Sequence, residues 1–424
     1  MLDLEFIVAN PDAVRDNAKN RNIQADVDLV LSLADDRKRL IQEVEATRRR
    51  QNDVARSVKG KLEDVKRRKL IDEGRGLKEM EIGQSERLKA VESRLREEQA
   101  KIPNITHPNS PIGKGEEDNI ELRRVGEIPK FDFQPRDHVE LAEIQDLIDF
   151  KNGAKVAGRD FYFLKNEAVL LEFALVKYAF ETLIGEGFTP FITPDLASLE
   201  IIEGLGYNPR GAESQIYDIE GVDLGLIATA EITLGGLMKD EIIPEDRLPL
   251  QFVGYSHCYR RESGAPGRVS KGLYRVHQFS KVEMFIFTKP EDSDAAHEYL
   301  LGIEESIFHG LGIPYRVVEC CTGDLGGPAY RKFDLEAWMP GRGENGDWGE
   351  ITSVSNCTDY QARRLNVRFR PEGKKPEFVH MLNGTAIAIS RALLAILENY
   401  QQADGTIVVP EALRAYMGKD LISR

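Results

Sequence analysis

The stretch YRRESGAPGRVSKGLYRVHQFSKVE, residues 259–283, concentrates arginine, glutamate and glycine between two segments that alternate polar and apolar residues. The first segment ends in RRE at 260–262, and the glycine-rich part that follows carries Arg268 and Lys271. This order predicts an antiparallel hairpin. An arginine on a rigid strand can hold a phosphate with two hydrogen bonds, and a neighbouring carboxylate can accept from an amino group. A surface hairpin with cross-strand ion pairs is the alternative interpretation.

The segments around this hairpin predict an α+β fold, with a mainly antiparallel β-sheet flanked by helices. Residues 248–261 and 274–287 have the alternation of strands, whereas 168–187 and 291–312 are helix-like. Short loops of the hairpin type join several of these segments, and such loops connect antiparallel neighbours. An antiparallel sheet is therefore favoured over a parallel one.

The composition is that of a globular chain with two or three domains. The 424 residues are 41% hydrophobic and 8% aromatic, enough for a substantial core. Lys plus Arg number 57 against 71 Asp plus Glu, and the resulting charge of −14 argues against nonspecific binding to nucleic acid or membranes. The four cysteines form no CxxC pair, which favours a reducing, cytoplasmic setting. We expect neither an export signal nor a membrane span.

Residues 26–102 have the heptad spacing of a coiled coil. Seam positions recur in alternating steps of three and four along residues 33–62 and again along 70–102, and six positions of each seam are apolar. Two such seams in succession predict a long antiparallel helical hairpin. Its tip is expected near residues 60–69, GKLEDVKRRK, where glycine and positive charge cluster.

The register of this helical hairpin follows from matching the two seams. It places Leu40 opposite Leu95 and Gln51 opposite Gln84. A polar layer formed by the two glutamines would help to fix that register.

Charge is divided unevenly along the chain. Residues 35–99 contain 19 Lys and Arg against 15 Asp and Glu, a net charge of +4, so the remainder carries −18. A stretch with three prolines then ends the helical pattern. We expect an amino-terminal domain at 1–104, a linker at 105–130 and a second domain at 131–424.

Common nucleotide, metal and hydrolase signatures are absent from the sequence. No GxxxxGK[ST] motif occurs, and the glycines at 204 and 206 lack the third glycine of a dinucleotide fingerprint. The histidines and cysteines show no standard zinc spacing, so no zinc is expected. No GxSxG is present, which gives serine-hydrolase chemistry no support.

Several blocks around the opening stretch match one family in order. YRRE at 259–262 matches the Phe-Arg-x-Glu core of motif 2, GFTPFITP ends in the motif 1 proline, Pro194, and the segment 380–400 contains the motif 3 arginine, Arg391. Further blocks are ATAE at 228–231 and GEITSVSNCTDYQARR at 349–364. The sequence thereby resembles the class II aminoacyl-tRNA synthetases, specifically the seryl-tRNA synthetases, over essentially the whole chain.

The resemblance implies three motifs and a two-step reaction. Motif 1 spans about 168–194, motif 2 about 252–285 and motif 3 about 380–400. ATP activates L-serine to seryl-adenylate with release of pyrophosphate, and the serine then passes to the 3′ end of tRNA(Ser), or of a selenocysteine tRNA where one exists. Mg²⁺ would assist, and motif 1 would supply the interface of a homodimer.

The resemblance also assigns roles to residues. Arg260 and Arg391 are the expected catalytic residues, on the α- and γ-phosphates, and Glu350 and Ser353 are the expected Mg²⁺ ligands. The ATP-binding set is Arg260, Arg261, Glu262, Val276, Glu350, Ile351, Thr352, Ser353 and Arg391. The serine-binding set is Thr229, Ala230, Glu231, Glu283 and Thr385. The tRNA-binding set is Arg48, Arg49, Arg50, Arg56, Lys66, Arg67, Arg68, Lys69, Arg268 and Lys271.

Two other functions remain open at this point. The chain could be a related enzyme that activates an amino acid for a carrier protein, although the basic helical hairpin argues against it. It could also be a catalytically silent paralogue that acts as a regulator. The presence of Arg260, Glu262, Glu350 and Arg391 argues against that alternative.

Overall fold

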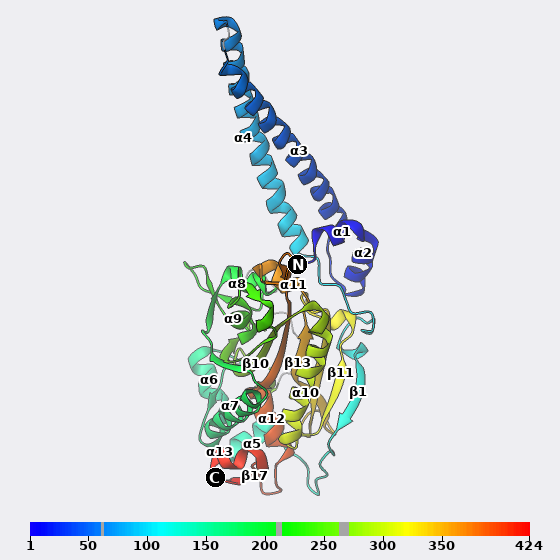
Figure 1. The fold of residues 1–424 in the computed structure, drawn as a ribbon. Helices are drawn as coiled ribbons and strands as arrows, with labels where there is room; N and C mark the ends of the chain where they lie inside the picture. Colours follow the sequence, from blue (N-terminus) through cyan, green and yellow to red (C-terminus); the bar gives the residue numbers. More distant parts are fainter. Residues whose placement is uncertain (61–62, 209–213, 263–270) are drawn as a thin grey trace. The chain divides into compact units, whose positions relative to one another are not determined.

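The computed structural model describes residues 1–60, 63–208, 214–262 and 271–424, which divide into two compact units, Met1–Ile105 and Thr106–Arg424 (Figure 1). In the first unit, two long helices run side by side as an antiparallel hairpin. The side chain of Asp26 caps the first of them by accepting from the backbone N–H of Leu29 at 2.9 Å. The expected coiled-coil hairpin is confirmed. The helices of this unit are α1 Leu4–Ala9, α2 Pro11–Asn20, α3 Val27–Val58 and α4 Asp64–Ala100.

The expected register of this hairpin is wrong by at least one helical turn. Gln84 accepts a hydrogen bond from the Thr47 hydroxyl at 2.8 Å, and Gln51 donates to the backbone oxygen of Leu77 at 2.9 Å, so the two glutamines do not face each other. The cause is the length of the turn. The helix α4 already begins at Asp64, so the run 66–69 lies on its first turns instead of in the tip loop.

The second unit is built on an eight-stranded sheet with the strand order β1-β11-β12-β13-β16-β10-β9-β4. All neighbours pair antiparallel except β4 and β9, which are parallel. The expected α+β fold on a mainly antiparallel sheet is therefore confirmed. The strands are β1 Ile120–Val125, β4 Thr189–Ile192, β9 Leu250–Tyr259, β10 Gln278–Thr288, β11 Tyr315–Glu319, β12 Arg331–Met339, β13 Asp347–Asn356 and β16 His380–Ala388.

Helices and small sheets surround this large sheet (Figure 1). The helices are α5 His138–Ile144, α6 Phe150–Ala157, α7 Glu167–Gly185, α8 Leu199–Gly204, α9 Ala230–Gly236, α10 Ser293–Gly310, α11 Tyr360–Leu365, α12 Ile389–Asn399 and α13 Glu411–Met417. The short strands are β2 Ile148–Asp149, β3 Phe163–Leu164, β5 Leu196–Ser198, β6 Tyr217–Asp218, β7 Leu224–Leu226, β8 Ile242–Pro244, β14 Arg368–Arg370, β15 Glu377–Phe378, β17 Ile407–Val408 and β18 Leu421–Ile422.

The strand β12 shows how the sheet separates an apolar face from a polar one. Phe333 and Leu335 are fully buried in the main core, whereas Asp334 and Glu336, which alternate with them, project to the opposite face, because successive strand residues point to opposite sides. Helix α10 packs on the apolar side, where its His297 stacks on Phe333 with ring centroids 4.9 Å apart. The other face is thereby left to charged side chains.

Part of the expected linker 105–130 belongs to the sheet. Residues 120–125 form β1, which pairs antiparallel with β11 at one edge. The prolines end the preceding helix, but the chain after them forms a strand that pairs with the edge of β11. Among the described residues, no helix is both long and apolar enough to cross a membrane.

Candidate active site

A cavity of about 520 Å³ opens on the polar face of the large sheet. Charged side chains reach it from β10, β12, β13 and α12, and from the residues that follow β9. A hollow of this size with convergent polar groups is typical of a small-molecule site. The arrangement brings residues together that are far apart in the sequence, such as Glu231 and Arg391.

Arg260 enters this cavity directly after β9. Its backbone N–H donates to the oxygen of His277 at 3.0 Å, which continues the pairing of β9 with β10. Its guanidinium group lies over the ring of Phe279, 5.3 Å from the centroid, and its Nε donates to the oxygen of Ala228 at 3.4 Å. The side chain is therefore held by the surrounding strand ends while it borders the cavity.

Glu262 and Val276 border the same part of the cavity. The Glu262 carboxylate pairs with the guanidinium of Arg275, and its backbone has the left-handed φ of +49°. Such a conformation is uncommon for a residue with a side chain and occurs often at functional positions. Val276 is buried and offers an apolar wall.

Arg391 lies at the start of α12 and is fixed from two sides. Its Nη1 donates to the backbone oxygen of Glu350 at 3.0 Å and lies 3.1 Å from the carboxylate Oε1 of the same residue. Its guanidinium stacks on the ring of Tyr274 at 4.9 Å, and Arg342 stacks on the same ring at 4.5 Å. Burial disfavours the charged form of Glu350, but the attraction of Arg391 and Lys332 outweighs this effect and lowers its pKa.

Glu231 projects into the cavity from the first turn of α9. The hydroxyl of Thr229 caps this helix by accepting from the Glu231 N–H at 3.2 Å. The carboxylate accepts from Tyr207 at 2.9 Å, from Gln361 at 2.7 Å and from Asn383 at 3.1 Å. Burial, together with the neighbouring Glu283, raises the pKa of Glu231 to about 7.

Glu283 and Thr385 form the adjacent wall with Lys281. The Nζ of Lys281 lies 2.5 Å from Oε2 of Glu283, and the Thr385 hydroxyl donates to the same oxygen at 3.1 Å. All three side chains are more than nine-tenths buried. Two glutamates and one lysine therefore share this pocket, which leaves a net negative charge when both carboxylates are ionised.

Most of the ATP and serine residues expected from the sequence line this one cavity. The lining residues are Arg260, Glu262, Val276, Glu350, Ile351, Thr352, Ser353, Arg391, Glu231, Glu283 and Thr385. Arg261 is exposed and borders no part of it. Thr229 and Ala230 are buried beside it, where Thr229 caps the helix that carries Glu231.

The sequence interpretation missed several polar residues of the site: Lys281, Lys332 and Asn383, which line the cavity, and Gln361, which contacts Glu231. Lys281 could have been suspected, because it and Glu283 are the two charged residues of β10 and lie two positions apart on that strand. Nothing in the local sequence distinguishes the other three residues, since each reaches the site only through the pairing of distant elements.

Among the described residues, none of those expected to bind tRNA lines this cavity, and all of them except Lys271 belong to the helical hairpin. Arg48, Arg50 and Arg49 are exposed and pair with Glu81, Glu73 and Glu45 at 2.7, 2.5 and 3.4 Å. Arg56, Lys66, Arg67, Arg68 and Lys69 are exposed too. Lys271 pairs with Asp137, and Arg268 lies outside the described residues.

Comparison with known proteins places these features in one family. Residues 1–106 match the seryl-tRNA synthetase N-terminal domain, and residues 215–400 match the tRNA synthetase class II core domain (G, H, P, S and T). The chain is 57% identical to the serine–tRNA ligase of Treponema denticola over 422 residues, 100% of each chain. A crystal structure of seryl-tRNA synthetase from Pyrococcus horikoshii complexed with ATP matches with a TM-score of 0.91 and 39% identity, covering 100% of this chain and 99% of that one.

A second solved structure also matches this chain over its full length. The cytoplasmic serine–tRNA ligase of Naegleria fowleri in complex with AMP has a TM-score of 0.86 and 33% identity, covering 100% of this chain and 99% of that one. With sequence identity and fold agreeing over the full length, the chain belongs to the seryl-tRNA synthetase family.

Proposed function

We propose that this chain activates L-serine with ATP and transfers it to tRNA(Ser), and to a selenocysteine tRNA where one exists. One observation carries this proposal: a single cavity joins two arginines suited to phosphates with a pocket of two glutamates suited to an amino acid. The relatives named above as serine–tRNA ligases, one of them solved with ATP, support the same assignment. We place the reaction in the cytoplasm, consistent with four cysteines that are all free and buried.

The first step needs positioning and charge stabilisation from the protein. The serine carboxylate, already ionised, attacks the α-phosphorus of ATP in line with the departing pyrophosphate. Arg260 would stabilise charge on the α-phosphate and Arg391 on the γ-phosphate, because both guanidinium groups border the cavity in fixed orientations. Glu262 would accept from the amino group of adenine, beside the apolar Val276.

Glu350 and Ser353 are suited to holding Mg²⁺. The lowered pKa of Glu350 keeps its carboxylate ionised, and the Ser353 hydroxyl on the same strand borders the same cavity. Two protein oxygens completed by phosphate and water form the kind of site that Mg²⁺ prefers. The ion would neutralise charge on the phosphates when it is bound.

The pocket around Glu231 and Glu283 is suited to the ammonium and hydroxyl of serine. Thr385 adds a hydroxyl group there. Alanine and glycine would leave these buried polar groups without a partner, and such a loss strongly disfavours binding. Threonine would be excluded from this pocket by steric conflict.

The exposed basic residues of the helical hairpin are suited to tRNA. RNA helices are recognised mostly by shape and backbone. The arm residues named above would bind the tRNA body, and Arg268 and Lys271 would guide its acceptor end toward the cavity. The terminal ribose hydroxyl then attacks the carbonyl carbon of seryl-adenylate and releases AMP.

The motif 1 region is suited to a dimer interface. Phe173 on α7 is 64% exposed and Ile192 on β4 is 84% exposed, although both are large and apolar. Leu170, also on α7, is a further exposed apolar side chain of this region. An exposed apolar surface of this kind is usually covered by a partner, which supports a homodimer.

Serine-dependent exchange of labelled pyrophosphate into ATP tests the proposed activity. We expect exchange with serine and at most weak exchange with threonine, alanine and glycine. Aminoacylation of purified tRNA then separates a tRNA ligase from an enzyme that loads a carrier protein. Absence of exchange with serine would contradict the proposal and would favour a silent paralogue.

Deletion of residues 35–99 should separate the two steps. We expect serine-dependent exchange to stay within about twofold, because the cavity lies entirely in the unit Thr106–Arg424, whereas tRNA charging should fall by at least about 100-fold as the phosphate contacts are lost. A full-length control in which Arg56, Arg67 and Arg68 become glutamine should raise the KM for tRNA and flatten its salt dependence. Loss of both steps on deletion would contradict this division of labour.

A further inference from the structure

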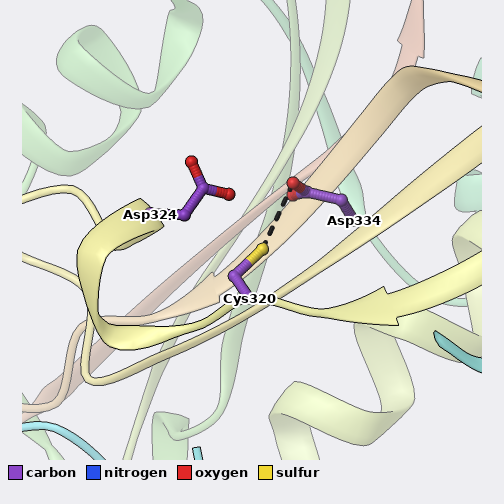
Figure 2. Close-up of side chains that lie close together, drawn as sticks. All are labelled: Cys320, Asp324 and Asp334. Atoms are coloured by element: carbon purple, nitrogen blue, oxygen red, sulfur yellow. Dashed lines mark hydrogen bonds between the residues drawn. The ribbon is translucent and has the colours of Figure 1, made fainter. Parts of the chain in front are cut away.

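A cluster of three side chains, two buried and one half-buried, lies beside the same cavity and outside the expected ATP and serine residues. The thiol of Cys320 and the carboxylates of Asp324 and Asp334 lie within 4.8 Å of one another and turn toward each other (Figure 2). Cys320 directly follows β11, Asp324 ends a short 3-10 helix, η5 Thr322–Asp324, and Asp334 lies on β12. Three such donors have the spacing of a metal site.

Lys332 already supplies a cation to this cluster. Its Nζ lies 3.3 Å from Oδ2 of Asp334 and 3.5 Å from Oδ2 of Asp324. The Cys320 thiol donates to Asp334 at 3.2 Å, and burial raises the pKa of this thiol well above its ordinary value, so sulfur is a neutral donor here. The place that a metal ion would take is therefore occupied by an ammonium group.

The surrounding contacts hold the carboxylate of Asp324 in place. The amide of Asn119 donates to Oδ2 of Asp324 at 3.0 Å, and its oxygen accepts from the backbone N–H of Cys321 at 2.9 Å. Only 5% of the surface of Asp334 is exposed. Such rigid support on a strand and a short helical turn fixes the position of the lysine that it contacts.

The Lys332 side chain also faces the cavity. It lines the cavity together with Glu350, Ser353 and Arg391, and 18% of its side chain is exposed. Burial disfavours its charged form, but the combined attraction of the acidic groups around it, Asp334 and Asp324 among them, outweighs this effect, so the pKa of Lys332 lies well above its ordinary value. An ammonium group has three N–H donors, and one of those of Lys332 donates to Asp324 at 3.5 Å while Asp334 forms an ion pair with the same group.

The register of β12 and β13 explains this placement. Lys332 pairs with Ser355, and Asp334 pairs with Ser353. Residues directly opposite in an antiparallel pair project from the same face of the sheet. Lys332 therefore stands one strand away from the residues expected to hold Mg²⁺ and the ATP phosphates.

We propose that Lys332 binds the β- and γ-phosphates of ATP and stabilises the departing pyrophosphate, and that Asp324, Asp334 and Cys320 position its ammonium group. This inference rests on the proposed function. In activation, a serine carboxylate oxygen bonds to the α-phosphorus while the bond from that phosphorus to the bridging oxygen breaks, and the electron pair leaves with pyrophosphate. A fixed cation beside the leaving group stabilises the charge that it gains.

Binding of ATP and AMP, measured by calorimetry without serine, tests this role. Lys332→Met removes the charge at similar volume and should lower the affinity for ATP about tenfold, the size of one charge-assisted contact. The affinity for AMP should change by less than about twofold. The KM for pyrophosphate in the exchange reaction should rise by a similar factor. Lys332→Arg keeps the charge and should restore most of the ATP affinity.

Lys239→Met is the matched control. It removes a lysine that pairs with Glu200 at 2.6 Å and lies outside the cavity, so nucleotide binding should not change. The proposal would be overturned if Lys332→Met lowered the affinities for ATP and AMP equally, or if it lowered neither.

A second variant keeps the test decisive if Lys332→Met does not fold. Asp324→Asn should raise the KM for ATP and for pyrophosphate with the KM for serine unchanged, and an equal rise in all three would count against a positioning role. Failure of the proposed function would look different, because the unaltered protein would then bind ATP yet show no serine-dependent exchange.

Discussion

Replacement of Arg391 by alanine is expected to reduce serine-dependent pyrophosphate exchange by about 100- to 1,000-fold, the cost of removing one fixed donor from a developing charge. Arg391 is suited to such a role because the Glu350 contacts at 3.0 and 3.1 Å and the Tyr274 ring together set the direction of its guanidinium plane. Its positive charge needs no reorganisation when the phosphates arrive. Most of the loss should appear in kcat, since the charge develops in the transition state.

Two further variants at this site separate geometry from charge. Arg391→Lys keeps the charge but loses the planar, two-donor geometry. Its rate of pyrophosphate exchange should therefore remain at least about tenfold below that of the unaltered enzyme. Arg342→Ala removes the other guanidinium that stacks on Tyr274 but does not line the cavity, so it should leave exchange within about threefold. Near-normal exchange by Arg391→Ala would exclude it from the phosphate site.

Replacement of Glu231 by glutamine is expected to lower the affinity for serine about 100-fold, which is within the range measured when one partner of a buried charge pair is removed. The substitution suits the surroundings. The amide oxygen of the introduced glutamine could still accept from Gln361 and Asn383, and its amide nitrogen could donate to the Tyr207 hydroxyl. The loss would therefore report the missing charge and not a collapsed pocket, and the KM for ATP should change little.

The raised pKa of Glu231 gives this site a pH dependence with a definite sign. Burial keeps the carboxyl protonated below about pH 7, and an ammonium substrate binds the ionised form. Serine affinity should therefore rise about tenfold between about pH 6 and about pH 8 as the ionised fraction grows. Binding of serine should in turn lower the pKa of Glu231.

The pH profile of serine KM measures this effect, and Glu231→Gln should abolish it. Glu200→Gln, a surface carboxylate paired with Lys239, is the matched control and should keep the profile of the unaltered enzyme. A profile that is flat in the unaltered enzyme, or one that Glu231→Gln leaves intact, would contradict the assignment.

The sequence was informative wherever a local pattern carries the structure. The alternation in residues 248–261 and 274–287 correctly predicted the paired strands β9 and β10, and the heptad seams predicted the long helices α3 and α4. Arg260, Glu231 and Arg391 could be singled out because each belongs to a contiguous block, and the structure brings all three to one cavity.

The errors arose where a position depends on distant parts of the chain. The register of the helical hairpin followed from the start of α4 at Asp64, which the seam spacing alone does not reveal. Residues 120–125 looked like a linker, yet they pair with β11, a strand far further along the chain.

The sequence by itself determined the family, the antiparallel class of the sheet and the residues that carry charge, because these depend on contiguous motifs and on the period of the apolar pattern. Only the tertiary structure decided which charges share a site. Lys332, Asp334 and Cys320 are inconspicuous along the chain, and they come to lie beside the ATP residues through the pairing of β11, β12 and β13. Strand order and register depend on the whole core, and no local spacing encodes them.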